Sequence, residues 1–219
     1  MVTIDSYSET NQSAQWNIRG IHPSAGNISA AGQSFTVSGA SYYLTEAVFY
    51  LKKAAVPDAT AVAVLYAHSG TYGTNSVPTG AALATSNGYA VSGLTGAYQL
   101  ITFTFPEPYY LMTAGQYCID IEISAAVLID NTNYVIFGAD STGPTHGGNC
   151  FRYTSGAWAS NAYDGCFYVN GNILETESGV WVQGERRPSQ ARTRHDDRVK
   201  KKKLLSILQM YLRSKVGKT

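Results

Sequence analysis

Two carboxylates in the segment YCIDIEIS (117–124) have the residue types and spacing that invite a catalytic interpretation. Asp120 and Glu122 are two positions apart, so in a β-strand both side chains point to the same face. Glycosidases need two carboxylates that face each other across the scissile bond, whereas neighbours along one strand lie side by side. The three isoleucines that alternate with them define an apolar face on the other side. We therefore interpret Asp120 and Glu122 as part of a solvated strand face.

A second group of oxygen-bearing side chains consists of Asp130, Asn131 and Asp140. Loops in many β-sandwiches supply such carboxylate and amide oxygens to Ca²⁺, which prefers oxygen ligands. The spacing does not match an EF-hand loop, and Asx-turn hydrogen bonds account for the same residues without a metal. We therefore expect no cofactor, with Ca²⁺ at these three residues as the alternative.

The three cysteines, Cys118, Cys150 and Cys166, are an odd number, so at least one thiol is left without a partner inside the chain. Cys150 and Cys166 flank a turn rich in Gly, Ser and Trp, and they are the candidates for a disulfide. Two buried, unpaired thiols in strands are an equal alternative. The spacing of the three does not match that of zinc ligands.

Aromatic side chains beside turns are the candidates for contact with a ligand. The chain has 16 tyrosines, and flat rings with a polar tip suit both sugar faces and protein partners. The loop HSGTYGTNSVPTG (68–80) consists mostly of turn-forming residues around His68 and Tyr72. We take these two residues, together with His146 and Trp158, as candidate ligand contacts. The alternative is that the rings cap the ends of the core.

These residues lie in a chain whose first 177 residues predict β-structure. Segments rich in Val, Ile, Phe, Tyr and Thr are bounded by clusters of Gly, Pro, Asn and Asp, and several alternate with period two. No helical periodicity occurs before residue 190. We predict an all-β fold, an antiparallel, jelly-roll-like β-sandwich over residues 1–177. The strand candidates are 15–21, 32–37, 44–54, 60–68, 98–105, 117–124, 133–140, 150–153 and 165–172.

The C-terminal part differs from the rest in charge. Residues 1–183 contain 4 basic and 12 acidic side chains (4 − 12 = −8), whereas residues 184–219 contain 12 basic and 3 acidic ones (12 − 3 = +9). Residues 178–198 predict a polar, charged linker, and residues 199–216 predict a basic amphipathic helix, since apolar residues recur there at helical spacing. We expect this helix to stay solvated or to dock on an acidic partner surface. Nucleic acid and anionic membranes are further alternatives, for the tail alone.

The sequence begins without the basic and apolar regions of a signal peptide, and no apolar run approaches the roughly 20 residues that span a bilayer. Charged residues make up only 14% of the chain, which is more typical of extracellular and virion proteins than of cytoplasmic enzymes. We therefore predict an extracellular or virion location. Asn11 and Asn27 lie in sequons (NQS and NIS), which matter only in a host whose secretory pathway glycosylates proteins.

Several segments, taken in order, resemble the choice-of-anchor R type β-sandwich module of bacterial surface and virion- or prophage-associated proteins. They are AGQSFTV, YYLTEAVFYLKKA, AVLYAHSGTYGTNSVPTGAALATS, YQLITFTF, GADSTGPTHGGN and GCFYVNG, and the likeness covers about residues 30–172. The resemblance implies a non-catalytic extracellular module, with Tyr72, His146 and Trp158 as surface contacts and no catalytic residue. The basic C-terminal segment departs from such modules, which usually continue into further β-domains or an anchor.

Three hypotheses about function follow. The leading one is a non-enzymatic structural and adhesive subunit of a virion or extracellular fibre, which self-associates into a homo-oligomer or filament through strand edges or exchange of a terminal strand. The segment MVTIDSY (1–7) is the candidate for that strand. The alternative is a carbohydrate-binding module for cell-surface glycans or polysaccharide. An enzyme is disfavoured because the sequence contains no recognisable set of nucleophile, acid and base residues.

Overall fold

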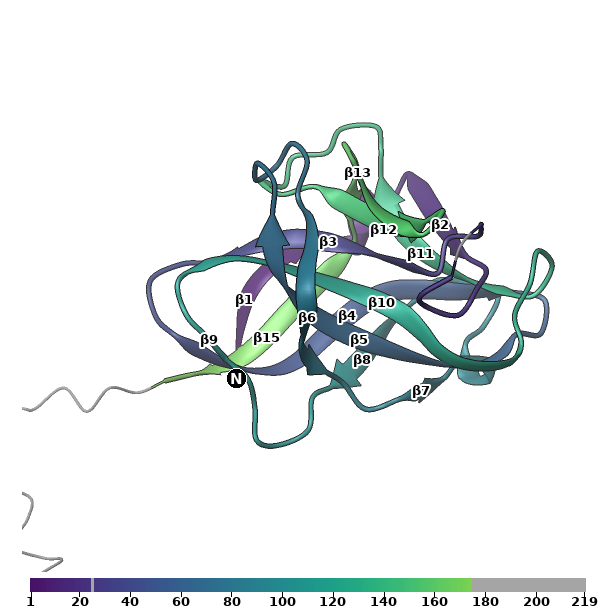
Figure 1. The fold of residues 1–219 in the computed structure, drawn as a ribbon, viewed down its shortest axis with the longest axis horizontal. Helices are drawn as coiled ribbons and strands as arrows, with labels where there is room; N and C mark the ends of the chain where they lie inside the picture. Colours follow the sequence, from purple (N-terminus) through teal and green to yellow (C-terminus); the bar gives the residue numbers. More distant parts are fainter. Residues whose placement is uncertain (25, 175–219) are drawn as a thin grey trace, which may run out of the picture. The chain divides into compact units, whose positions relative to one another are not determined.

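The computed structural model describes residues 1–24 and 26–174, which form two antiparallel β-sheets (Figure 1). The prediction of an all-β, antiparallel architecture is confirmed for these residues. The predicted linker (178–198), the predicted basic helix (199–216) and the last residues of the predicted 1–177 domain lie outside the described residues. Within the described ranges, no helix combines the length and apolarity that crossing a membrane requires.

The first sheet, here called sheet A, is built around the long strand β4. One side of β4 pairs with β15 and then with β11, and the other side pairs with β8 and β9. β1 pairs with β15 at one edge, while β2 and β14 pair with β11. The bounds are β1 (Val2–Tyr7), β2 (Ala14–Ile18), β4 (Tyr42–Ala54), β8 (Gln99–Thr104), β9 (Leu111–Met112), β11 (Tyr134–Asp140), β14 (Asp164–Gly165) and β15 (Phe167–Ile173).

The second sheet, here called sheet B, has the strand order β13-β12-β3-β10-β5-β6, and β7 also pairs with β5. β10 is its central strand, because it pairs with β3 on one side and with β5 on the other. The bounds are β3 (Ala30–Val37), β5 (Asp58–Ser69), β6 (Val77–Thr85), β7 (Tyr89–Ala90), β10 (Gly115–Leu128), β12 (Cys150–Thr154) and β13 (Ala157–Asn161). Two short 3₁₀ helices, η1 (Glu9–Asn11) and η2 (Val91–Gly93), complete the described elements.

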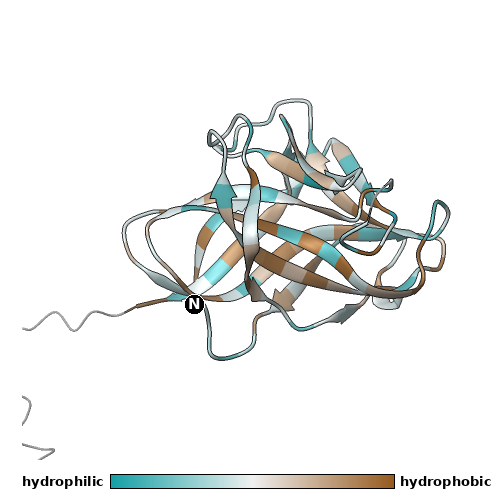
Figure 2. Ribbon diagram, in the orientation of Figure 1, coloured by the Kyte–Doolittle hydropathy of each residue, from teal (hydrophilic) through white to brown (hydrophobic). Residues whose placement is uncertain are grey.

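One apolar core contains side chains from both sheets, and hydrophobic residues are concentrated along their strands (Figure 2). The three isoleucines of β10 are fully buried in it, as their alternation predicts. Phe49 of β4 packs edge-on against Phe103 and Phe137, with ring centroids 5.9 and 5.6 Å apart. Burying a ring of this size stabilises the fold by about 2–3 kcal/mol.

The outer face of β10 is also buried, and here the structure differs from the sequence-based prediction. The exposed fraction is 0% for Asp120 and 7% for Glu122, so the prediction of a solvated strand face is wrong. The alternation does place both carboxylates opposite the isoleucines. That face, however, is covered by aromatic side chains of neighbouring strands and by the turn that precedes β3. The pattern along a single strand carries no information about such a cover.

β3 and β10 approach each other so closely at Gly32, the residue that pairs with Asp120, that a side chain does not fit there. A Cβ atom would collide with the Ile119 carbonyl oxygen and lie 2.5 Å from the Asp120 Cα. We expect Gly32→Ala to lower the free energy of unfolding by about 1–3 kcal/mol, measured by urea denaturation. Gly96→Ala is the control, because a Cβ there meets nothing within 4 Å. If Gly32→Ala proves as stable as this control, β3 and β10 do not approach each other as closely at Gly32 as described.

Candidate functional site

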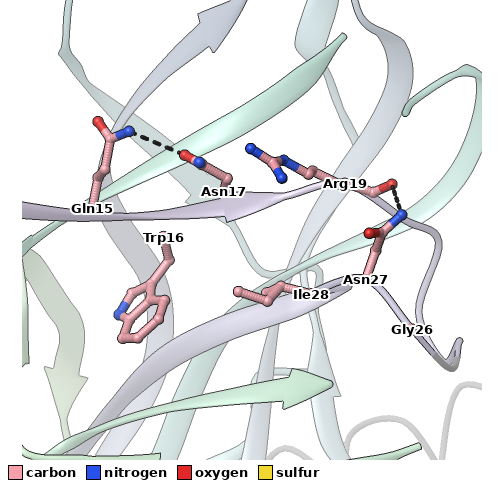
Figure 3. A pocket seen from close by; sticks show the side chains of 7 residues that line it. All are labelled: Gln15, Trp16, Asn17, Arg19, Gly26, Asn27 and Ile28. Atoms are coloured by element: carbon pink, nitrogen blue, oxygen red, sulfur yellow. Dashed lines mark hydrogen bonds between the residues drawn. The ribbon is translucent and has the colours of Figure 1, made fainter. Parts of the chain in front are cut away.

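A groove of about 370 Å³ opens beside β2 and the turn that follows it (Figure 3). Gln15, Asn17 and Arg19 lie on one side of strand β2, and Trp16 and Ile28 lie on its other side. The side chains that line it therefore combine apolar contact with hydrogen-bonding groups of fixed geometry. The lining residues are Gln15, Trp16, Asn17, Arg19, Gly26, Asn27 and Ile28.

Strand β2 positions the polar side of the groove. Gln15 and Asn17 pair with Gly138 and Ile136 of β11, and their two-residue spacing places both side chains on one face. The Gln15 amide donates a hydrogen bond to the Asn17 Oδ1 over 3.2 Å, and the hydroxyl of Tyr98 donates to the Gln15 Oε1 over 3.3 Å. These bonds restrict the amide rotamers and so present the groups in a defined orientation.

The turn after β2 closes the groove from the other end. The backbone N–H of Arg19 donates to the Ile28 carbonyl over 2.8 Å, and the Asn27 amide donates to the Arg19 carbonyl over 3.5 Å (Figure 3). The chain thus returns on itself between residues 19 and 28. Residues nine positions apart in sequence come to line one depression.

Two cation–π contacts fix the charged side chains near the groove. The Arg19 guanidinium carbon lies 4.6 Å from the ring centroid of Tyr134, and the buried Nε of Arg19 has no acceptor among the described residues. Trp16 stacks on Tyr163 with centroids 5.3 Å apart, and the Arg152 guanidinium carbon lies 4.5 Å from its ring. Arginine stacked on an aromatic face keeps its remaining N–H groups in a fixed fork. The groove thereby gains one positive charge, and no carboxylate is among its lining residues.

This arrangement can recognise a ligand that offers several hydroxyl or carboxylate oxygens. Amide side chains both donate and accept hydrogen bonds, and the guanidinium only donates. Sequence reasoning missed these residues, except that Asn27 was named as a sequon. The signal was available in the strand candidate 15–21, where Gln15, Asn17 and Arg19 alternate with apolar residues.

The predicted contacts His68 and Tyr72 lie elsewhere, at the end of β5 and in the turn before β6. The His68 Nε2 lies 2.9 Å from the Ser76 hydroxyl. The rings of His68 and Tyr72 pack edge-on, with centroids 5.9 Å apart. Ser76 exchanges two hydrogen bonds with Asn149, which ties the 68–80 loop to the segment before β12. The 68–80 loop is thus bound to the segment before β12, and neither His68 nor Tyr72 is among the residues that line the groove.

His146 belongs to a buried hydrogen-bond network rather than to a surface contact, since its side chain is only 8% exposed. Its Nδ1 accepts from the Gly148 N–H at 3.0 Å and lies 3.0 Å from the Gln33 amide nitrogen. The proton consequently resides on Nε2, which donates to Asp5 over 3.1 Å. Burial raises the pKa of Asp5, but hydrogen bonds from His146, Thr36 and Ser6 outweigh it and bring the pKa below its usual value.

Trp158 lies at the centre of an aromatic cluster on the outer face of sheet B. In β13 it pairs with Tyr153, and its ring also contacts those of His22, Tyr66 and Phe151. The centroid distances for these four contacts range from 5.1 Å (Tyr153) to 5.9 Å (Tyr66). Trp158 therefore packs over neighbouring strands on the outer face of sheet B, and it does not line the groove.

The same cluster encloses the carboxylates of β10. The Tyr66 hydroxyl donates to the Glu122 Oε1 over 2.8 Å, and the His22 Nε2 lies 3.6 Å from the same oxygen. Both carboxyl oxygens of Asp120 are buried without a hydrogen-bond partner among the described residues. Burial, followed by the adjacent Glu122, raises the pKa of Asp120 well above its usual value, and burial raises the pKa of Glu122 to about 7. Burial lowers the pKa of His22.

The proposed calcium ligands do not come together. Asp130 lies in the turn before β11, where it accepts hydrogen bonds from the backbone of Thr132 and Asn133. Asp140 ends β11, roughly 20 Å away at the usual rise per strand residue, and it accepts from the Tyr7 hydroxyl over 2.8 Å. The prediction of one site formed by Asp130, Asn131 and Asp140 is therefore wrong. In the part of the chain that the structure describes, no three His, Cys, Asp or Glu side chains gather as metal ligands.

The cysteines are all buried and unpaired. The disulfide between Cys150 and Cys166 is thus absent, and the alternative of buried thiols holds. Cys150 lies in β12 of sheet B, whereas Cys166 stands between β14 and β15 of sheet A. Burial raises the pKa of the Cys166 thiol to about 12, which keeps it protonated and unreactive at neutral pH. Both sequon asparagines, Asn11 and Asn27, have exposed side chains.

No family model, no curated protein and no solved structure shows a significant match to the chain. The resemblance to choice-of-anchor R modules accordingly stays a prediction, and the candidate groove rests on its geometry.

Glu122 makes the stability of the fold depend on pH. Its pKa is higher in the folded chain (about 7) than the ordinary value of 4.5, so the folded state binds the proton more tightly. The corresponding stability is present at acid pH and is lost as the pH rises from about 4.5 through 7. We expect the free energy of unfolding, measured in urea, to fall by about 2–3 kcal/mol between pH 5 and pH 8.

The variant Glu122→Gln should lose the part of that dependence that comes from Glu122 and be more stable than the natural chain at pH 8. The part that comes from the raised pKa of the buried Asp120 should remain. Lowering of the His22 pKa acts in the opposite sense and removes stability only below the ordinary histidine value of 6.5. Asp58→Asn, at an exposed position, is the control and should follow the natural chain. An equal fall in all three proteins would show that Glu122 is not the titrating group.

Proposed function

We propose that this chain is a non-enzymatic module that binds carbohydrate in the groove between β2 and the turn of residues 19–28. The observation that carries the proposal is the lining of that groove, which combines three amide side chains and one guanidinium with the apolar side chains of Trp16 and Ile28 around strand β2. Sugar rings present hydroxyl groups that both donate and accept, and C–H faces that seek apolar contact. The groove offers a counterpart to each.

The charge distribution favours a carboxylated or neutral sugar over a basic ligand. Arg19 supplies the positive charge of the groove. A guanidinium recognises a carboxylate or a hydroxyl oxygen well. No carboxylate, histidine, cysteine or serine is among the residues that line the groove, so the lining offers contacts for binding and none of the usual acids, bases or nucleophiles of a hydrolase.

The test is binding to a glycan array that includes neutral and uronic-acid polysaccharides, followed by titration calorimetry. We expect Asn17→Ala to weaken binding about tenfold, because an amide that makes one or two hydrogen bonds to a ligand is worth about 1–1.5 kcal/mol. Asn172→Ala is the matched control, since Asn172 is exposed in β15 and does not line the groove. No binding to any glycan at high protein concentration, or equal affinity of both variants, would refute the proposal.

A second candidate is the structural and adhesive subunit of a virion or extracellular fibre. It is favoured by β1, which forms an edge of sheet A, and by three exposed apolar residues at the ends of β1 and β15: Met1, Val2 and Ile173. Such an edge can pair with another copy. The jelly-roll connectivity, the C-terminal helix and the extracellular or virion location predicted from the sequence belong to this proposal.

Self-association should be tested by a charge at the edge rather than by deleting residues 1–12. Deletion would remove Tyr7 from the core and Asp5 from its bond to His146, so loss of assembly would be ambiguous. If the edge associates, Val2→Lys should shift a concentration-dependent oligomer towards monomer in light scattering, because lysine on an edge strand opposes pairing. Val56→Lys, at another exposed valine, is the control. A natural chain that is monomeric at all concentrations would exclude this function.

A further inference from the structure

We propose that His22 and the carboxyl pair of Asp120 and Glu122 form a pH-dependent latch, which docks the turn of residues 19–24 and 26–29 and thereby shapes the groove. Raising the pH above neutrality would release this turn. The effect on ligand affinity rests on the proposed function, but the release of the turn does not. Three sets of contacts carry the inference.

The first is that one turn contacts both sites. Arg19, Asn27 and Ile28 line the groove, while His22 lies 3.6 Å from the Glu122 Oε1 on the outer face of sheet B. Movement of His22 away from sheet B would displace the chain between Arg19 and Asn27. The groove and the carboxyl pair are thus joined by a few residues of backbone.

The second is the set of bonds that dock the turn on sheet B. The His22 N–H donates to the Ile123 carbonyl of β10 over 2.9 Å, and the Ser29 N–H donates to the Tyr153 carbonyl of β12 over 3.1 Å. The His22 ring packs against Tyr153 and Trp158 with centroids 4.6 and 5.4 Å apart. Ile28 at the far end of the turn packs against the apolar core, whereas the His22 end lies over the carboxyl pair, so the docking of that end depends on the state of the polar groups beneath it.

The third is the set of titratable groups that face one another there. They are Asp120, Glu122 and Cys118 of β10, Tyr66 of β5, Tyr153 of β12 and His22 of the turn. No lysine or arginine of the described residues forms an ion pair with either carboxylate, and the only cationic partner in reach is His22. Burial shifts the pKa values of Glu122 and His22 in opposite directions, since it raises that of Glu122 and lowers that of His22.

With a pKa of about 7, Glu122 ionises in a pH range in which His22, whose pKa is lowered by burial, is mostly uncharged. The neutral carboxyl is compatible with the dry environment under the aromatic rings. Once ionised, Glu122 needs water or a cation, and Asp120 beside it adds repulsion if it ionises too. Water reaches the carboxylate most directly by displacing His22, because at Glu122 strand β10 is paired with β3 on one side and with β5 on the other.

The experiment is amide hydrogen exchange by NMR at pH 6.5 and pH 8.5, expressed as protection factors so that the intrinsic pH effect on exchange is removed. We expect the His22 and Ser29 amides to lose at least tenfold in protection at pH 8.5, while amides within the β10 ladder keep theirs. Glu122→Gln should abolish this loss, and Asp58→Asn should retain it. Unchanged protection in the natural chain, or the same loss in Glu122→Gln, would overturn the latch.

A second measurement keeps the test decisive if Glu122→Gln does not fold. In the natural chain, the midpoint of the loss of protection should coincide with the titration of the Glu122 carboxyl, read from its carbon chemical shift. Midpoints more than one pH unit apart would overturn the proposal. Any glycan found on the array should bind at least tenfold more weakly at pH 8.5 than at pH 6.5. Absence of a glycan would refute the proposed function alone, whereas pH-independent binding with a released turn would refute the coupling.

Discussion

The burial of both faces of β10 is the constraint on which the rest of this structure depends. On one face its isoleucines enter the core, and on the other two carboxyl groups lie beneath aromatic rings. A carboxylate cannot be transferred from water into such an environment at little cost, so the outer face must keep its acids protonated or solvate them. The aromatic cluster around Trp158 and the turn before β3 form the cover of this outer face, so they surround the two carboxyl groups. The groove follows from it, since the turn that covers Glu122 also forms the groove wall.

A second polar network, centred on His146, joins sheet A to sheet B. His146 donates to Asp5 of β1, and its backbone N–H donates to Asp164 of β14 over 2.7 Å, while Gln33 of β3 contacts both His146 and Asp164. Every member of this network has a partner, so it stabilises the fold. Asp120 has none, and this contrast separates the two buried polar regions. The hydrogen-bonded groups around His146 have a structural role. Asp120, which lacks a hydrogen-bond partner, marks the region where a change of protonation affects the structure.

The two proposals for the molecule use different parts of it. Recognition of a sugar would use fixed amide and guanidinium groups of β2 and its following turn, whose positions are set by pairing with β11 and by the return of the chain at Ile28. Assembly into a fibre would use the edge strand β1. The two surfaces are distinct sets of residues, and a module that binds glycans can also be a repeating subunit. The 68–80 loop belongs to neither surface: it contributes no residue to the lining of the groove, and its Ser76 is hydrogen-bonded to Asn149 before β12.

The amino-acid sequence alone determined the class of the fold and the facing of individual strands. The alternation in 117–124 correctly separates the isoleucines of the core from Asp120 and Glu122, because side chains in a strand alternate whatever surrounds it. What covers the second face was decided by tertiary structure, since Tyr66, Trp158 and His22 reach it from segments roughly 40 to 100 residues away in the chain. For the same reason the sequence indicated a short strand at Gln15, Asn17 and Arg19 but not the groove beside it. It also grouped Asp130 and Asp140 as one site. The residue pattern along one strand shows to which face each side chain points. Only the packing between elements shows which residues that side chain contacts.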